Sequence, residues 1–302
     1  MKRTIIIAEA GVNHNGNMAL AKQLVDVAAE AGADYVKFQT FRTENLVSKK
    51  TTLAEYQKKN LGKDNGDQFD MLKTLELTEA DHLELIDYCR KRGIRFLSTA
   101  FDMESLEFLH SLCLDYWKIP SGEITNYPYL KAIAGYGGKV IMSTGMCSIS
   151  DISDAIDVLI RFGIKREDIS LLHCNTEYPT PLQDVNLYAM VEMKREFDMA
   201  TGYSDHTKGI EIPVAAVALG ATIIEKHFTL NRNMSGPDHA ASLEPDELKT
   251  MVTYIRNVEK ALGCAFKTVT ESEQKNIRIA RKSIVASVNI SEGEAFSEQN
   301  LC

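Results

Sequence analysis

The amino-acid sequence predicts an α/β protein of the (β/α)8 class, the TIM barrel. Short apolar runs recur along the chain at 5–10, 35–41, 94–101, 116–121, 139–145, 169–175, 198–206 and 222–230. Segments with helical spacing separate these runs, and near-continuous apolar strands that alternate with helices form parallel sheets buried on both faces. Eight such units in about 260 residues match the size and count of this barrel.

The helical period is clearest in the first and the last of the intervening segments. Residues 20–31 repeat apolar side chains at i, i+4, i+7 and i+8, and residues 248–262 form a second stripe. Pro245 and Gly263 flank the second stripe as start and stop signals. A doubly wound open sheet is the alternative fold, but no GxGxxG or P-loop pattern opens any of the expected helices.

The barrel is expected to occupy residues 1–265. Residues 266–282 are charged and are interpreted as a linker, and residues 283–302 as the incomplete beginning of a small second domain. About twenty residues are too few to fold around a core of their own. Within the barrel, the long polar segment 42–77 is interpreted either as a lid or specificity element or as an irregular excursion.

Composition narrows the classes of partner and the compartment. A net charge of −8 offers no general attraction to nucleic acid or to an anionic membrane. The apolar start of the chain is too short for a signal peptide, and no apolar run approaches the roughly 18 residues of a membrane span. Six cysteines without a CxxC pair fit reduced thiols. We therefore expect a cytoplasmic protein that binds small molecules.

Two histidines at the ends of the last two strands predict a divalent-metal site. Because strand side chains alternate, Ser204 and His206 share one face, as do Glu225 and His227. Without cysteine partners, the imidazoles do not form a closed zinc site. Completed by water, carboxylate or substrate oxygen, they suit Mn²⁺, with Mg²⁺ and Co²⁺ as alternatives. A hydrogen-bonded core histidine in each strand is the other interpretation.

Two lysines at strand ends predict an anionic ligand. Lys37 and Lys118 are expected to face inward, where an unpaired ammonium group is costly. Pairing with Glu9 and Glu123 is the structural alternative. Hydroxyl groups on the same strand ends would add hydrogen-bond donors for a phosphate. Those hydroxyls belong to Ser98, Thr99, Ser121, Ser143 and Thr144.

Nine motifs, in order over residues 5–240, carry a resemblance: AEAGVNHNG, VKFQTF, FLSTAFD, KIPSGEI, STGM, LLHCNTEYPTP, GYSDHT, EKHFTL and SGPDH. Together they resemble the sialic acid synthase family, the nonulosonic acid synthases that join phosphoenolpyruvate to an N-acylated mannose-type sugar. The tail SIVASVNISEGEAFSEQNL resembles the start of the antifreeze-like domain that follows the barrel in this family.

The resemblance implies a transferase in which C3 of phosphoenolpyruvate attacks a metal-held open-chain aldehyde. Water then adds at C2, and phosphate leaves by C–O cleavage. N-acetylmannosamine and 2,4-diacetamido-2,4,6-trideoxymannose are the candidate sugars, and the VKFQTF and SGEIT forms favour the legionaminic-type branch. The family also implies a homodimer.

Matched motif by motif, the family assigns roles to individual residues. It makes His206 and His227 the metal ligands, and Glu9, Lys118, Glu123 and Glu225 catalytic, with Glu123 acting on the attacking water. The expected phosphoenolpyruvate contacts are Lys37, Thr99, Lys118, Ser121, Ser143, Asn175, Thr176 and Ser204. The expected sugar contacts are Gln39, Tyr178 and Asp238.

The sequence departs from the family pattern at three points. Asn175 and Thr176 stand in reversed order, and Ala100 replaces a frequent proline. The chain also ends before the arginine that the family's small domain delivers to the partner's sugar site. The alternative function is therefore a barrel that binds phosphoenolpyruvate and metal with little or no turnover.

Overall fold

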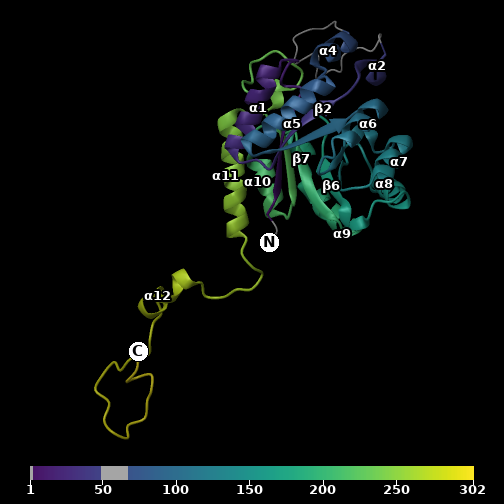
Figure 1. Ribbon diagram of the computed structural model, residues 1–302. Coiled ribbons are helices and arrows are strands. Elements are labelled where there is room, and N and C mark those ends of the chain that lie inside the picture. The colour runs from purple at the N-terminus through teal and green to yellow at the C-terminus, as the bar shows by residue number, and fades with distance from the viewer. Residues whose placement is uncertain (1–2, 49–66) are drawn as a thin grey trace. The chain divides into compact units, whose positions relative to one another are not determined.

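The computed structural model describes residues 3–48 and 67–302 (Figure 1). The chain divides into two units, Met1–Leu262 and Gly263–Cys302.

A parallel eight-stranded sheet forms the centre of the first unit, in the order β3-β2-β1-β8-β7-β6-β5-β4. Among the described residues, no ladder joins the outermost strands β3 and β4, although the two strands are in contact, so the barrel is nearly closed. The predicted (β/α)8 class is confirmed. The strands are β1 (Ile5–Gly11), β2 (Tyr35–Thr40), β3 (Arg95–Ala100), β4 (Trp117–Ile119), β5 (Val140–Ser143), β6 (Ile169–Cys174), β7 (Ala200–Asp205) and β8 (Ile223–His227).

Helices connect the strands and lie around them (Figure 1). Two short helices and the 3-10 turns lie in the loops. Residues 49–66 of the predicted polar segment lie outside the described residues, so its role as a lid stays a prediction. The helices are α1 (Met18–Ala31), α2 (Thr43–Leu46), α4 (Gln68–Leu75), α5 (Glu79–Arg92), α6 (Met103–Ser111), α7 (Tyr127–Tyr136), α8 (Ile149–Arg161), α9 (Leu187–Phe197), α10 (Glu211–Ala218) and α11 (Pro245–Ala261), and the turns are η1 (Ser121–Glu123), η2 (Arg166–Asp168), η3 (Leu182–Asp184) and η4 (His239–Ala241).

Local sequence explains where the two predicted helices begin and end. The side chain of Asn17 accepts hydrogen bonds from two backbone amides at the start of α1, and Gly32 ends this helix at φ +82°. At α11, Pro245 occupies the first turn, and the side chains of Glu244 and Glu247 form a capping box. The expected apolar stripe of α11 is buried against the barrel.

Alternation along the strands divides the barrel interior into two layers. The lower layer is apolar and buried, and the side chains two positions further along the same strands are mostly polar. The lower layer contains Ile7, Tyr35, Leu97, Ile141, Leu172 and Ile223, and the next layer contains Glu9, Lys37, Thr99, Ser143, Cys174 and Glu225. The strands therefore place a set of polar groups at their carboxyl ends on top of an apolar floor.

The second unit contains one helix, α12 (Glu271–Ala280), and an isolated antiparallel bridge between Ala286 and Leu301. The helix begins with a capping box formed by Thr270 and Glu273. The residues interpreted as a linker thus include a helix. The assignment of residues 283–302 to the incomplete beginning of an antifreeze-like domain stays a prediction.

Among residues 3–48 and 67–302, none of the helices combines the length and the apolar character that a membrane span requires.

Candidate active site

A cavity of about 190 Å³ lies at the carboxyl ends of the strands, and every strand contributes a residue to its wall. Most of the predicted site residues line this cavity. They are Glu9, Lys37, Gln39, Thr99, Lys118, Ser121, Ser143, Thr176, Tyr178, Ser204, His206, Glu225 and His227. The alternation that predicted shared faces for Ser204 with His206, and for Glu225 with His227, agrees with this arrangement.

Lys37, on β2, is buried in the cavity among acceptors from three other strands, β1, β3 and β8. Its Nζ lies 2.8 Å from Oε2 of Glu9 and 3.6 Å from Oε2 of Glu225. The ammonium group also donates a hydrogen bond of 3.0 Å to Oγ1 of Thr99. Lys37 is therefore held between two carboxylates.

Of the structural alternative, the pairing with Glu9 is present at Lys37, but Lys118 has a carboxylate partner other than Glu123. Its Nζ donates to Oγ of Ser143 at 2.8 Å and lies 3.5 Å from Oε1 of Glu225. The suggested pairing with Glu123 is wrong, because the chain turns after the short strand β4 and carries Glu123 onto η1. Glu225 thus serves both lysines.

The two buried carboxyl groups of the cavity differ in their affinity for a proton. Burial raises the pKa of Glu9 to about 7, against the opposing effect of Lys37. Burial would also raise the pKa of Glu225, but Lys118 and Lys37 outweigh it and lower that pKa to about 2. The hydroxyl of Ser204 adds a hydrogen bond of 2.9 Å to Glu225. Near neutral pH, Glu9 can therefore exchange a proton, whereas Glu225 is a fixed anion.

The lysines differ in a similar way. Burial lowers the pKa of Lys118. Burial acts in the same direction on Lys37, but Glu225 and Glu9 raise its pKa overall. Lys37 is therefore the more firmly charged of the two ammonium groups.

His206 and His227 face the same cavity, with ring centroids 5.5 Å apart. Burial lowers the pKa of His206 to about 4 and the pKa of His227 well below its usual value. Both rings are therefore neutral near pH 7. The ring of Tyr178 packs against both of them, at 4.1 Å from His206 and 5.6 Å from His227.

The two imidazoles fit a divalent cation in their chemistry. Nδ1 of His206 donates to the backbone carbonyl of Asn175, which leaves Nε2 as the basic nitrogen. Nδ1 of His227 is buried and has no hydrogen-bond partner within the described part of the chain. In residues 3–48 and 67–302, no group of three or more His, Cys, Asp and Glu side chains could hold a metal. Water or substrate would have to complete the site, as in the open site that the sequence predicts.

Three predicted site residues are not part of the cavity wall. Glu123 lines a neighbouring cavity, where its carboxylate accepts a 2.6 Å hydrogen bond from Asn126. The side chain of Asn175 accepts a hydrogen bond from the backbone amide of Glu177. Asp238 is buried, and this burial raises its pKa to about 6. The roles that the sequence assigned to these three residues stay predictions.

Sequence reasoning missed Cys174, Phe101 and Met146, which also line the cavity. Cys174 is the last residue of β6. It is buried, but its Sγ lies 3.2 Å from Oγ of Ser121 inside the cavity. Strand alternation could have identified it, because Leu172 and Cys174 lie two positions apart on β6.

Gly145 holds the loop after β5 close to this wall. A Cβ atom at this position would lie 2.7 Å from Cγ2 of Thr176 and 3.0 Å from Oγ of Ser121. The backbone amide of Gly145 donates a 2.9 Å hydrogen bond to the same Ser121 hydroxyl. A residue without a side chain is thus needed for the loop to approach the cavity.

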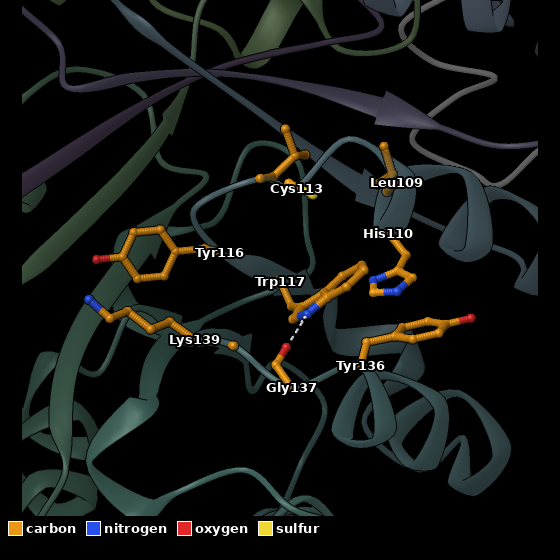
Figure 2. Close-up of a pocket in the computed structure, with 10 residues that line it drawn as sticks. Leu109, His110, Cys113, Tyr116, Trp117, Tyr136, Gly137 and Lys139 are labelled. Atoms are coloured by element: carbon orange, nitrogen blue, oxygen red, sulfur yellow. Dashed lines mark hydrogen bonds between the residues drawn. The ribbon is translucent and has the colours of Figure 1, made fainter.

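A second cavity, of about 230 Å³, lies near the amino-terminal ends of β4 and β5. Figure 2 shows Trp117 at its centre, with the indole nitrogen directed at the carbonyl of Gly137, to which it donates a 2.7 Å hydrogen bond. The rings of His110 and Tyr136 stack beside it with centroids 4.0 Å apart (Figure 2). None of the predicted site residues lines this cavity.

The barrel and its first cavity together define the class of protein. Ionisable groups at the carboxyl ends of barrel strands are typical of TIM-barrel enzymes, which carry their active sites at this face. The polar layer above an apolar floor, with carboxyl groups of different pKa, is such an arrangement.

Comparison with known proteins identifies the family. The model of the NeuB family matches residues 24–267, and the chain belongs to this family of sialic acid synthases, which are enzymes. It is 56% identical over 301 residues to N,N'-diacetyllegionaminic acid synthase of Campylobacter jejuni, covering 100% of this chain and 90% of the relative. It is 47% identical over 298 residues to the synthase of the same name from Legionella pneumophila, covering 98% and 83%.

A solved structure supports the same assignment. The crystal structure of N-acetylneuraminic acid (sialic acid) synthetase from Leptospira borgpetersenii, in complex with citrate, superimposes with a TM-score of 0.79 at 36% identity. The match covers 92% of this chain and 91% of that one. The fold and the family are thus supported by both sequence and structure.

Proposed function

We propose that the protein condenses phosphoenolpyruvate with an N-acylated mannose-type sugar and water, and releases a nonulosonic acid and phosphate. The observation that carries this proposal is the pair of buried ammonium groups, Lys37 and Lys118, in one hydroxyl-lined cavity at the barrel rim. When Glu9 holds a proton, two ammonium groups face one carboxylate, Glu225. An anionic ligand then supplies the missing negative charge.

The names of the relatives guide the choice of sugar. Two relatives, at 56% and 47% identity, are N,N'-diacetyllegionaminic acid synthases. A product with two N-acetyl groups requires a sugar that carries two acetamido groups, and we propose 2,4-diacetamido-2,4,6-trideoxymannose as the preferred substrate. N-acetylmannosamine is the alternative.

The cavity offers phosphoenolpyruvate both charge and hydrogen-bond donors. The hydroxyls of Thr99 and Ser143 already contact Lys37 and Lys118 at 3.0 and 2.8 Å, so ammonium and hydroxyl groups can turn together toward a bound anion. Ser121 and Ser204 lie on the same wall. In the proposal, these groups hold the phosphate and carboxylate of the substrate and orient its C3 toward the aldehyde.

Proton transfer falls to the carboxyl groups. As C3 attacks the aldehyde carbon, the carbonyl oxygen becomes an alkoxide and must take up a proton. Glu9 is suited to deliver it, because burial raises its pKa to about 7. Water then adds at C2, one proton leaves, and the C–O bond to phosphate breaks. Glu123 lines the neighbouring cavity, which shares Phe101 with this one, and we propose that it acts on that attacking water.

Glu225 is proposed to act through its charge. It stays ionised beside Lys37 and Lys118 and fixes both ammonium groups in place. His206 and His227 would hold a divalent ion, Mn²⁺ with Mg²⁺ and Co²⁺ as alternatives, which when bound supplies Lewis acidity for the aldehyde oxygen. Gln39, Tyr178 and Asp238 are proposed to contact the sugar.

The proposal extends to assembly and compartment. The family resemblance suggests a cytoplasmic homodimer, and light scattering on the purified protein would measure the dimer directly. A single monomeric species at working concentration would contradict the proposed homodimer and would leave the proposed reaction unaffected.

One assay tests the reaction. The protein is given phosphoenolpyruvate, Mn²⁺ and each of the two sugars in turn, and phosphate release and product mass are recorded. Lys118→Met should abolish most of the release, whereas Lys139→Met should not, because Lys139 is exposed at the other end of the barrel. Binding of phosphoenolpyruvate without any nine-carbon product from either sugar would overturn the proposal.

A further inference from the structure

A second ion pair lies directly behind the two imidazoles, on the face of β7 and β8 that points away from the cavity. Asp205 precedes His206, and Lys226 precedes His227, so strand alternation turns the pair to the opposite side. Nζ of Lys226 lies 2.5 Å from Oδ2 of Asp205, and both side chains are 0% exposed. Neither residue lines the cavity.

The polar atoms of this pair are well satisfied. The backbone amide and the hydroxyl of Thr207 donate to Asp205, each at 3.0 Å. Lys226 also donates to the backbone carbonyl of Thr207. The ion pair therefore ties β8 both to the last residue of β7 and to the turn that follows His206.

Stability alone does not explain such a pair. Removing two charges from water is costly, and well-packed apolar side chains often stabilise a protein equally well at such a position. The neighbouring residues Tyr203 on β7, Ile224 on β8 and Phe228 just after β8 belong to the apolar core between sheet and helices. An ion pair at this position therefore indicates a role other than stability, namely to fix one arrangement of the two strands.

The register of the strands shows what the pair controls. Asp205 and Lys226 are Cα partners in the β7–β8 ladder, and this is the last pairing before the two histidines. Beyond it, the β7–β8 ladder ends. Thr180 donates a backbone hydrogen bond to His206 and Leu243 donates one to His227, both 2.9 Å, and His227 is also the Cα partner of Glu9 in the β1–β8 ladder. A slip of one residue here would turn an imidazole to the other face.

We propose that the Asp205–Lys226 ion pair is a positioning device that sets the spacing of His206 and His227, and through it the affinity for a divalent cation. The inference rests on the proposed function in one respect, that the imidazoles bind metal. Asp205 and Lys226 touch neither substrate nor cation, so they are positioning residues. Groups of this kind behind metal ligands typically change metal affinity by roughly 10- to 100-fold.

The test compares Mn²⁺ affinity in folded proteins, measured by electron paramagnetic resonance of the free ion. The double variant D205N/K226Q removes both charges but keeps amide groups that can accept from and donate to Thr207. We expect it to bind Mn²⁺ roughly 10-fold or more weakly. Phosphoenolpyruvate affinity without metal should change much less than the Mn²⁺ affinity, because Asp205 and Lys226 do not line the cavity and Lys37 and Lys118 lie on other strands. A purely structural role would lower the melting temperature and leave Mn²⁺ affinity unchanged below it.

The control is a different ion pair, far from the imidazoles along the strands, between Arg256 and Asp34. Its charged atoms lie 2.9 Å apart, and its side chains are 18% and 9% exposed. Asp34 lies just before β2, at the amino-terminal end of the barrel, so D34N/R256Q should not change Mn²⁺ affinity. If D205N/K226Q does not fold, Lys226→Gln alone keeps Asp205 and its Thr207 contacts and carries the same expectation. Equal affinity in wild type and folded variants overturns the positioning role. Failure of the wild type to bind Mn²⁺ overturns instead the metal site of the proposed function, and the positioning role with it.

Discussion

Glu9 and Lys37 are Cα partners across β1 and β2, and their side chains form a buried ion pair of 2.8 Å inside the barrel. The same Lys37 lies 3.6 Å from Glu225, which has a second cation nearby. Glu9 therefore shares its one close lysine, Lys37, with Glu225. Glu225 has two lysines nearby, Lys37 and Lys118. Burial raises the pKa of both carboxyl groups, and because Lys118 and Lys37 together outweigh it only at Glu225, the pKa is raised to about 7 for Glu9 and lowered to about 2 for Glu225.

The first prediction concerns the dependence of stability on pH. The pKa of Glu9 is raised from 4.5 to about 7 in the folded state. A raised acid pKa means that the folded state binds the proton more tightly, so this stabilising contribution is present below pH 4.5 and is lost as pH rises through 7. Glu9→Gln should remove this component from urea unfolding curves measured between pH 5 and about 8. An unchanged pH profile in the variant would show that Glu9 titrates normally.

The second prediction concerns the buried lysines. Lys118→Met should lower kcat/KM by about 100-fold or more, the usual effect of removing one charged donor from an active site. It should also lower stability, because Glu225 loses one of its two cations. Steady-state kinetics and thermal melting test the two effects. If the variant were more stable and equally active, Lys118 would be only a structural charge.

The third prediction concerns metal removal. Treatment with a chelator should abolish turnover, and added Mn²⁺ should restore it and raise the melting temperature of the wild type. His206→Ala and His227→Ala should each remove the thermal shift, since each deletes one of only two protein ligands in the proposed site. A shift that persists in both variants would place the cation elsewhere.

The fourth prediction compares two glycines. A Cβ atom at Gly202 would lie 2.2 Å from the backbone oxygen of Ile223, so Gly202→Ala should destabilise the barrel by about 1–3 kcal/mol or more. Gly135 lies within α7, and a Cβ atom there would meet nothing within 4 Å. Gly135→Ala should stabilise by about 0.5–1 kcal/mol. Urea unfolding of both variants should give opposite signs, and the same sign in both would contradict the close approach at Gly202.

Strand alternation made the fold and most of the cavity wall predictable from sequence. It puts Lys37 and Gln39 on one face of β2, and Glu225 and His227 on one face of β8, because each pair lies two positions apart on a buried strand. The carboxylate partner of Lys118 was not predictable, because the position of Glu123 depends on how the chain turns at Pro120 into η1. Alternation alone also does not show that Asp205 and Lys226 meet behind the histidines, because that contact depends on the register of β7 against β8.

Trp117 is the only tryptophan in the 302 residues, and it directly precedes Lys118 on the three-residue strand β4. Its indole is anchored to Gly137 and packed near His110 and Tyr136, with ring centroids 6.1 and 5.5 Å away. Fluorescence excited at the indole band thus originates from one site, one peptide bond away from the ammonium group that is expected to meet phosphoenolpyruvate. A change in this emission when phosphoenolpyruvate is added would therefore report substrate binding without any label.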